Sequence, residues 1–257
     1  MHNATPLVSV LMCHHLPENR KYLDACLRSL EAQEGCDFEV ILAYDNYEPE
    51  GLPSYVRKFR VADGLRWVHK INVGARQADP ESKYFFLLND DVILAKHTIA
   101  TLARKCANFG VVMNPMSQCD NGWLFNANIT LNNPGPQGKY SSRQLTKRFY
   151  AFEELAEWQD AIIHHKPGPD LVHFESYVCF YATMIPRTVW NAVGQLDEGC
   201  LSSHDDEDYC MRARKLGVPS AIDFESFALH FGGATSAKTT TDQDRAETLA
   251  HFNKKWK

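Results

Sequence analysis

The stretch Tyr84–Val92 reads Tyr-Phe-Phe-Leu-Leu-Asn-Asp-Asp-Val. Its four consecutive apolar residues, Phe85–Leu88, predict a strand buried on both faces of a sheet. Asn89, Asp90 and Asp91 follow at the carboxyl end of that strand, the edge where open α/β sheets bind ligands. The two adjacent carboxylates repel each other, and a divalent cation with oxygen ligands relieves that repulsion. On this stretch alone, an ordinary Asn-Asp turn explains the same residues equally well.

Composition places the chain among ordinary globular proteins. Its 257 residues are 44% hydrophobic and 23% charged, which suits one sizeable α/β domain. The net charge of -5 argues against a broad nucleic-acid-binding face, although it allows a local basic groove. There is no basic signal-peptide start, and no apolar run approaches the roughly 20 residues of a membrane span. The 8 Cys contain no Cys-x-x-Cys pair, and several lie in apolar contexts, so we expect reduced core thiols, which fits a cytoplasmic protein.

Apolar runs and turn residues predict alternating strands and helices. Strands are expected at 7–12, 38–44, 65–69, 84–88 and 177–185, and helices at about 22–33, 97–108, 151–164 and 187–193. This order predicts a mostly parallel sheet with helices on its faces. Asn72-Val73-Gly74 is expected to form a turn. The segment 114–138, rich in Asn, Pro and Gly, is too long for an ordinary connection and is expected to be functional or mobile.

An acidic cluster, Asp205–Asp208, follows two serines and begins a predicted helix that ends before Gly217. Acids in a first turn favour the helix dipole, so capping explains part of the cluster. Four consecutive carboxylates exceed what capping requires. Crowding raises their pKa values, whereas the helix start lowers them. A carboxylate between these two effects is a candidate general base.

His230 follows an apolar strand and precedes Gly232-Gly233. A single histidine in such a position is more often a packed core residue than a ligand. The glycines, however, allow the backbone to approach a ligand closely. An imidazole added to an aspartate site favours manganese or a similar ion over calcium.

Together these segments resemble the family 2 glycosyltransferases with the GT-A fold. Asn89-Asp90-Asp91 is similar to the family's Asp-x-Asp motif, and Asp205–Arg212 is similar to Glu-Asp-x-Asp-Leu-Cys-x-Arg. Weaker matches, in the right order, are the first strand and helix, Asp45, Asn72-Val73-Gly74, Val193–Glu198, His230 and Lys255-Trp256. The resemblance implies an α/β GT-A fold, with a mostly parallel mixed sheet flanked by helices. It implies a single domain over 1–257, with a nucleotide-binding half at about 1–113 and an acceptor-binding and catalytic half at about 114–257.

The resemblance also implies a reaction: inverting, metal-dependent transfer of a sugar from a nucleoside diphosphate sugar to an acceptor hydroxyl. Asp206 is the implied catalytic base, and Asp91 and His230 are the implied ligands of Mn²⁺ or Mg²⁺. Asn89 stands where the family's motif has its first Asp, which leaves Asp91 as the main metal ligand. Contacts to the donor are expected from His14, Asp45, Arg76, Asn89 and Asp90. No special role is expected for His15.

Three other functions remain open from the residues. A nucleotidyltransferase normally has a Gly-rich phosphate loop after the first strand, and Cys13–Pro17 contains none. A metal-dependent hydrolase would turn over its substrate without an acceptor, and a carbohydrate-binding module on the same fold would be non-catalytic. Glycan, lipid-linked sugar, protein and nucleic-acid base all remain possible acceptors, the last less favoured by the negative charge. The sequence does not identify the sugar, the nucleotide or the oligomeric state, nor the role of 114–174.

Overall fold

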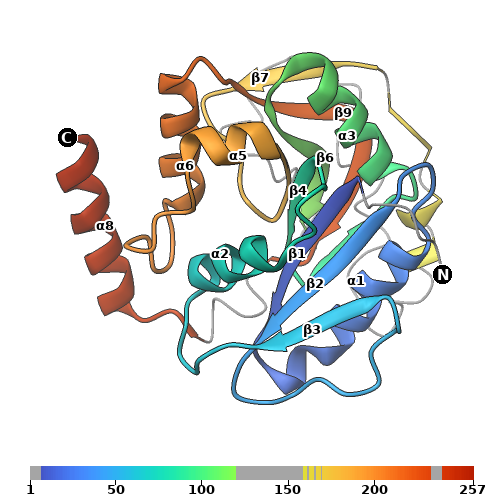
Figure 1. The fold of residues 1–257 in the computed structure, drawn as a ribbon, viewed down its shortest axis with the longest axis horizontal. Coiled ribbons are helices and arrows are strands. Elements are labelled where there is room, and N and C mark those ends of the chain that lie inside the picture. Colours follow the sequence, from blue (N-terminus) through green and yellow to red (C-terminus); the bar gives the residue numbers. More distant parts are fainter. Residues whose placement is uncertain (1–6, 120–158, 161, 165, 169, 233–238) are drawn as a thin grey trace.

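Strand β4 (Tyr84–Leu88) lies inside a mixed sheet in the computed structural model of the protein (Figure 1). The structure describes residues 7–119, 159–160, 162–164, 166–168, 170–232 and 239–257. Among these residues the sheet has nine strands, in the order β3-β2-β1-β4-β8-β6-β9-β5, with β7 paired to β9.

The remaining elements follow in chain order. The strands are β1 (Val8–His14), β2 (Phe38–Tyr44), β3 (Val56–Arg60), β5 (Val92–Leu94), β6 (Val112–Cys119), β7 (Val172–Glu175), β8 (Ala182–Pro186) and β9 (Ser220–His230). The helices are η1 (Pro17–Asn19), α1 (Arg20–Glu31), α2 (Trp67–Gln77), α3 (Thr98–Phe109), α5 (Arg187–Val193), α6 (Asp205–Lys215) and α8 (Asp242–Trp256). The predicted elements at β1, β2, β4, α1, α3 and α5 are confirmed.

The sheet has two halves that differ in strand direction. β3, β2, β1 and β4 run parallel, so the carboxyl ends of these strands lie at one edge. Beyond β4 the sheet becomes mixed: β8 is antiparallel to β4 and β6, while β6 and β9 are parallel. The predicted α/β class, with a mixed sheet flanked by helices, is confirmed.

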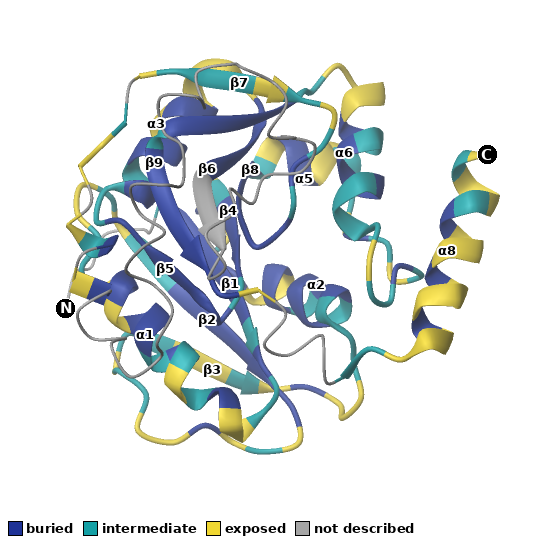
Figure 2. Ribbon diagram, turned by 180° about the vertical axis from the view of Figure 1, so that it is seen from behind, coloured by how far each residue is buried: buried dark blue, intermediate teal, exposed yellow. Residues whose placement is uncertain are grey.

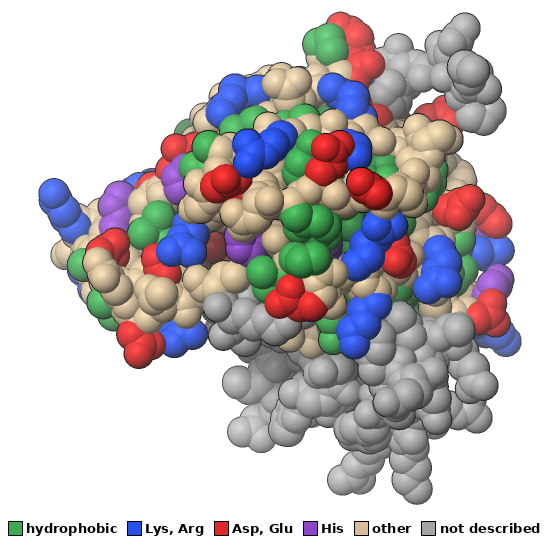
Figure 3. All heavy atoms as spheres, turned by 90° about the horizontal axis from the view of Figure 1, so that it is seen from below, with side chains coloured by type: hydrophobic (Ala, Val, Ile, Leu, Met, Phe, Trp, Pro, Cys, Tyr) green, Lys and Arg blue, Asp and Glu red, His purple; other side chains and the backbone are tan. Residues whose placement is uncertain are grey.

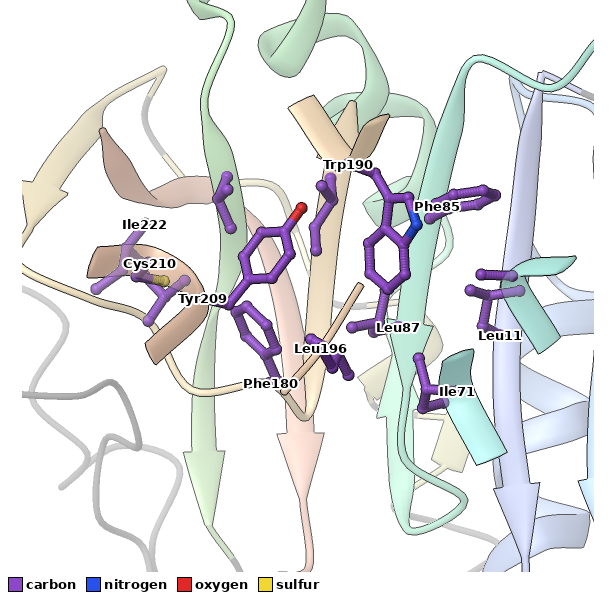
Figure 4. Close-up of a cluster of buried hydrophobic side chains, with 14 of the residues drawn as sticks. Leu11, Ile71, Phe85, Leu87, Phe180, Trp190, Leu196, Tyr209, Cys210 and Ile222 are labelled. Carbon is purple, nitrogen blue, oxygen red and sulfur yellow. The ribbon is translucent and has the colours of Figure 1, made fainter. Parts of the chain in front are cut away.

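The apolar run of β4 is buried on both faces of the sheet, as predicted. Phe85 and Leu87 pack in the cluster that includes residues of α2, α5 and α6, whereas Phe86 and Leu88 pack in the cluster with residues of α1 and α3. Figure 4 shows the first of these clusters, in which Phe85 meets the ring of Trp190 edge to face at a centroid distance of 5.3 Å. Helix α8 stands outside these layers, and its outer side is largely exposed (Figure 2).

The predicted third strand at 65–69 is wrong, because most of it belongs to helix α2. Val68, Ile71 and Ala75 are buried at helical spacing, so this segment packs as a helix against β1 and β2. The real third strand is β3, at the edge of the sheet. It carries the charged residues expected of an edge strand. These charges obscure the apolar alternation by which a strand is recognised in a sequence.

The predicted turn at Asn72-Val73-Gly74 is also wrong, since these residues lie within α2. The Asn72 amide donates to the carbonyl of Leu196 and accepts from its N–H, both at 3.0 Å. Gly74 faces Leu11 of β1, where an added Cβ would lie 3.7 Å from a Leu11 methyl. Asn72 therefore holds the segment before α6 to α2, and Gly74 packs against β1 at a distance that would also accommodate a Cβ.

Later predicted elements match the structure less closely. The strand predicted at 177–185 is limited to β8, and β7 before it was not predicted. The helix predicted at 151–164 lies largely outside the described residues; 159–160 and 162–163 are helical. Within the described ranges, none of the helices has the length and apolar character needed to cross a bilayer.

Candidate functional site

A cavity of about 650 Å³ opens beside the carboxyl ends of β1 and β4. Its lining combines residues from α2, from the loop after β4, from the segment before β8, and from the start of α6. Five of the predicted site residues line it: Asn89, Asp90, Asp91, Asp206 and His230. The sheet therefore brings together side chains that are more than a hundred residues apart in the sequence.

Asp91 and His230 are neighbours because β5 pairs with β9, with Val92 opposite His230. The Nε2 atom of His230 lies 3.2 Å from Oδ1 of Asp91. The His230 ring stacks on Tyr181, with centroids 4.8 Å apart and an interplanar angle of 12°. Both side chains are largely buried, so their positions are fixed by packing.

These two residues fit a divalent metal ion. Adjacent ligands of an octahedral ion with bonds of roughly 2.1 Å lie about 3 Å apart. The distance between the Asp91 oxygen and the His230 nitrogen is close to this value. Within the described part of the chain no group of three His, Cys, Asp or Glu side chains converges on a metal position. Substrate phosphate oxygens and water would therefore have to complete the coordination.

Asp90 and Asn89 take different positions at the end of β4. Asp90 lines the cavity but turns one oxygen to His14 Nδ1, 2.5 Å away. Burial raises the pKa of Asp90, although the hydrogen bond with His14 acts in the opposite direction. His14 itself is buried behind the cavity and does not line it. The Oδ1 atom of Asn89 is buried without a hydrogen-bond partner among the described residues, which leaves it available to a ligand.

Asp45 is fully buried and lies behind the cavity wall. Its Oδ1 atom accepts from Lys70 Nζ at 2.6 Å and lies 2.7 Å from His15 Nδ1. Lys70 and His15, not Asp45, line the cavity. Sequence reasoning missed both residues. Assigning 67–77 as a helix would have placed Lys70 one turn from Trp67, another cavity residue.

Arg76 is not brought together with the other predicted site residues. Its guanidinium donates to Oε1 of Gln195 at 3.1 Å, and Arg76 does not line the cavity. This contact joins α2 to the segment between α5 and α6. The position of Arg76 in the last turn of α2 directs it away from the edge where β1 and β4 end.

The run of four acids separates into distinct contacts at the start of α6. Asp205 and Asp206 line the cavity, whereas Asp208 is fully buried and pairs with Arg212 at 2.8 Å and Lys255 at 2.7 Å. Asp206 Oδ1 accepts from the backbone N–H of Glu207 at 2.7 Å. The residue before α6 is His204, so the predicted serine cap is wrong.

Desolvation at the cavity wall distinguishes the two acids that line it. It raises the pKa of Asp206, and the Glu207 N–H acts against this effect. It raises the pKa of Asp205 well above the ordinary value, and the neighbouring Asp206 charge adds to the shift. Because the Glu207 N–H donates to Asp206 and so favours its charged form, Asp206 is the better candidate for an ionised base.

Comparisons with known proteins identify the family and the fold. The model of glycosyl transferase family 2 matches residues 9–156, more than half of the chain. Among solved structures, the chain is similar to one described as GalNAc-T7 with UDP, GalNAc and Mn²⁺, with a TM-score of 0.61. That alignment has 14% sequence identity and covers 89% of this chain and 44% of that chain, so this chain spans less than half of GalNAc-T7. No significant match was found among curated proteins.

The structural similarity supports the GT-A fold, and the match to the family model extends from β1 past β6. It includes the acidic end of β4 that forms one wall of the cavity. The chain belongs to glycosyl transferase family 2.

Proposed function

We propose that the protein is an inverting, metal-dependent glycosyltransferase that moves a sugar from a nucleoside diphosphate sugar to an acceptor hydroxyl. One observation carries the proposal: the Asp91–His230 pair and Asp206 line the same cavity. A binding module has no need of a carboxylate with a raised pKa beside its ligand, whereas a transferase needs a base there.

In this mechanism each residue has a defined role. Asp91 and His230 would hold Mn²⁺ or Mg²⁺, which supplies Lewis-acid stabilisation of the leaving diphosphate when bound. Lys70 and His15 face the donor, and buried Asp45 orients both of them. Asp206 accepts the proton of the acceptor hydroxyl as its oxygen attacks the anomeric carbon. The bond from that carbon to the diphosphate breaks on the opposite face, so the configuration inverts.

The proposal also includes a glycan or other hydroxyl compound as the acceptor and the cytoplasm as the location of the protein. On the face seen in Figure 3, Lys and Arg side chains of the described residues alternate with Asp and Glu side chains. This mixture favours a glycan or other hydroxyl acceptor over a nucleic acid. The cysteines whose side chains the structure describes are free thiols, as expected in a reducing cytoplasm.

Nucleotide binding tests the donor half of the proposal, and UDP is the first ligand to try because the similar structure was solved with UDP and Mn²⁺. We expect UDP with Mn²⁺ to raise the melting temperature. A ligand at 100 times its Kd stabilises a fold by about 2.7 kcal/mol. EDTA should remove this shift, and Asp91→Asn should weaken it. Thermal-shift assays over a panel of nucleoside diphosphates measure each effect.

Asp242→Asn is the matched control, because this exposed carboxylate at the start of α8 does not line the cavity. It should respond to UDP and Mn²⁺ as the wild type does. The donor assignment fails if no nucleoside diphosphate shifts the melting temperature. Metal dependence fails if the shift is the same in EDTA.

The rate of transfer should also depend on pH through Asp206. A general base acts in its ionised form, so kcat should rise with pH as Asp206 loses its proton. Because burial raises the pKa of Asp206, the midpoint should lie above the roughly 3.9 of an ordinary aspartate. Initial rates at saturating donor and acceptor, from about pH 4 upward, measure this limb. A rate already constant at the acidic end would exclude Asp206 as the base.

A further inference from the structure

His204 holds an unusual backbone conformation at the wall of the cavity. Its φ of 59° places it in the left-handed region, which among the described non-glycine residues only Asn46 shares. Such conformations cost free energy and persist where the surroundings enforce them, often at functional sites. Here the left-handed residue directly precedes Asp205 and Asp206 and sets the direction in which α6 starts.

Two contacts fix the His204 ring. One face stacks on Phe252 of α8, with centroids 4.6 Å apart and an interplanar angle of 23°. Its Nδ1 atom lies 3.0 Å from a carboxylate oxygen of Glu207. Phe252 is itself buried, so the ring has a firm support. About a third of the His204 side chain remains exposed, and it lines the cavity together with Asp206.

Helix α8 holds the whole loop that carries His204. Thr248 Oγ1 accepts from the N–H of Leu201 at 3.0 Å, and Trp256 Nε1 donates to Asp208 at 2.9 Å. Lys255 pairs with both Asp208 and Asp197. The loop before α6 is thereby anchored at both ends, and the ring of His204 is pre-oriented before any substrate binds.

The Glu207 carboxylate determines which ring nitrogen of His204 carries a proton in the neutral form. A carboxylate only accepts hydrogen bonds, so the Nδ1–H of His204 donates to Glu207. In the neutral imidazole the other nitrogen, Nε2, is then an acceptor. This nitrogen has no protein hydrogen-bond partner within the described ranges. Neutral His204 can therefore accept a hydrogen bond from a hydroxyl group in the cavity.

We propose that His204 positions the acceptor by accepting a hydrogen bond from a second acceptor hydroxyl, next to the one whose proton Asp206 takes. This inference rests on the proposed function. His204 and Asp206 are two positions apart in the sequence and line the same cavity, so together they suit a substrate with two hydroxyls. A sugar with a vicinal diol provides them, whereas a serine or threonine side chain provides one. The expected acceptor is therefore a sugar.

The test compares wild-type protein with His204→Asn and His204→Gly, both of which tolerate the left-handed conformation. Acceptors are methyl glycosides of common monosaccharides and their monodeoxy analogues. In the wild type, removing the hydroxyl that binds His204 should raise the acceptor KM about 3- to 10-fold, the value of one neutral hydrogen bond. In both variants this difference between the parent and deoxy sugars should disappear, while the donor KM stays within about twofold.

His173→Asn is the matched control, because His173 also pairs with a glutamate, Glu175, at 3.1 Å but lies outside the cavity. It should retain the wild-type preference for the parent sugar. If His204→Asn retains this preference as well, the inference is wrong. It is also wrong if a serine- or threonine-containing peptide is used as well as the best methyl glycoside.

A measurement without turnover separates this inference from the proposed function. The ¹⁵N resonance of His204 Nε2 is followed by NMR while the methyl glycosides are added in the presence of UDP and diamagnetic Mg²⁺, because Mn²⁺ would broaden resonances in the cavity. A saturable shift with one sugar, absent with its deoxy analogue, supports the inference even if no sugar is transferred, in which case the proposed function alone fails. No shift with any of the sugars overturns the inference.

Discussion

Replacing Asp206 by asparagine should lower the rate of sugar transfer by about 10²- to 10⁴-fold, the usual contribution of a general base. The amide cannot take the acceptor proton, but its oxygen can still accept from the Glu207 N–H that Asp206 binds at 2.7 Å. The start of α6 should therefore be unchanged. Steady-state kinetics give the rate, and thermal shift with UDP and Mn²⁺ should show undiminished nucleotide binding.

Asp205→Asn provides the control for this prediction. Burial raises the pKa of Asp205 well above its ordinary value, which favours its protonated form, and an amide resembles that form closely. Its loss of rate should stay below about tenfold, less than the usual effect of removing a base. The opposite ranking of the two variants would show that Asp205 is the base. If both variants retain the wild-type rate, neither Asp205 nor Asp206 has a catalytic role.

Lys105→Met should lower the free energy of unfolding by about 3–5 kcal/mol, the usual effect of leaving a buried charge without its partner. Lys105 is almost fully buried and pairs with Asp223 at 2.5 Å, Asp170 at 2.8 Å and Glu225 at 3.1 Å. Burial lowers the pKa of Lys105, but hydrogen bonds to Asp170 and Asp223 raise it above its ordinary value. Asp223 is fully buried, so the ammonium group of Lys105 is the main group that offsets the cost of burying its charge.

The effect should be large because Asp223 also shapes β9. Its carboxylate accepts from the N–H groups of Glu225 and Ser226, where the register between β6 and β9 shifts. Urea denaturation measures the change, with Lys96→Met as control. Lys96 is partly exposed and contacts Glu34 at 3.4 Å, so its loss should cost at most about 1 kcal/mol. Equal effects of the two variants would show that the buried cluster adds nothing to stability.

The central part of the fold can be predicted from the sequence, because buried elements have a regular pattern of apolar residues. Phe85–Leu88 is apolar throughout since both faces of β4 are covered, and α1 and α3 show helical spacing since each buries one side. The charged edge strand β3 has no such apolar pattern. The apolar start of helix α2 resembles a short strand, so the sequence alone predicts a strand there.

For the candidate site, the motifs predict several of the residues that line the cavity. They do not predict which other side chains those residues contact. Asp91, Asp206 and His230 lie at the cavity as expected. Asp45 was placed in direct contact with the donor, but Lys70 and His15 cover it. Such covering depends on partners from separate elements, and a single sequence does not reveal which side chains will meet.

The pairing of β5 with β9 has a consequence for how the chain folds. Asp91 leaves the ribosome long before His230, and the two meet only when β9 enters the sheet between β6 and β5. Contacts of this sequence separation form slowly, because a long loop must close first. A chain that stalls before β9 docks has the carboxylate without its imidazole. If Asp91 and His230 bind a metal ion as proposed, metal affinity would distinguish fully folded molecules from trapped intermediates that contain only the parallel half of the sheet.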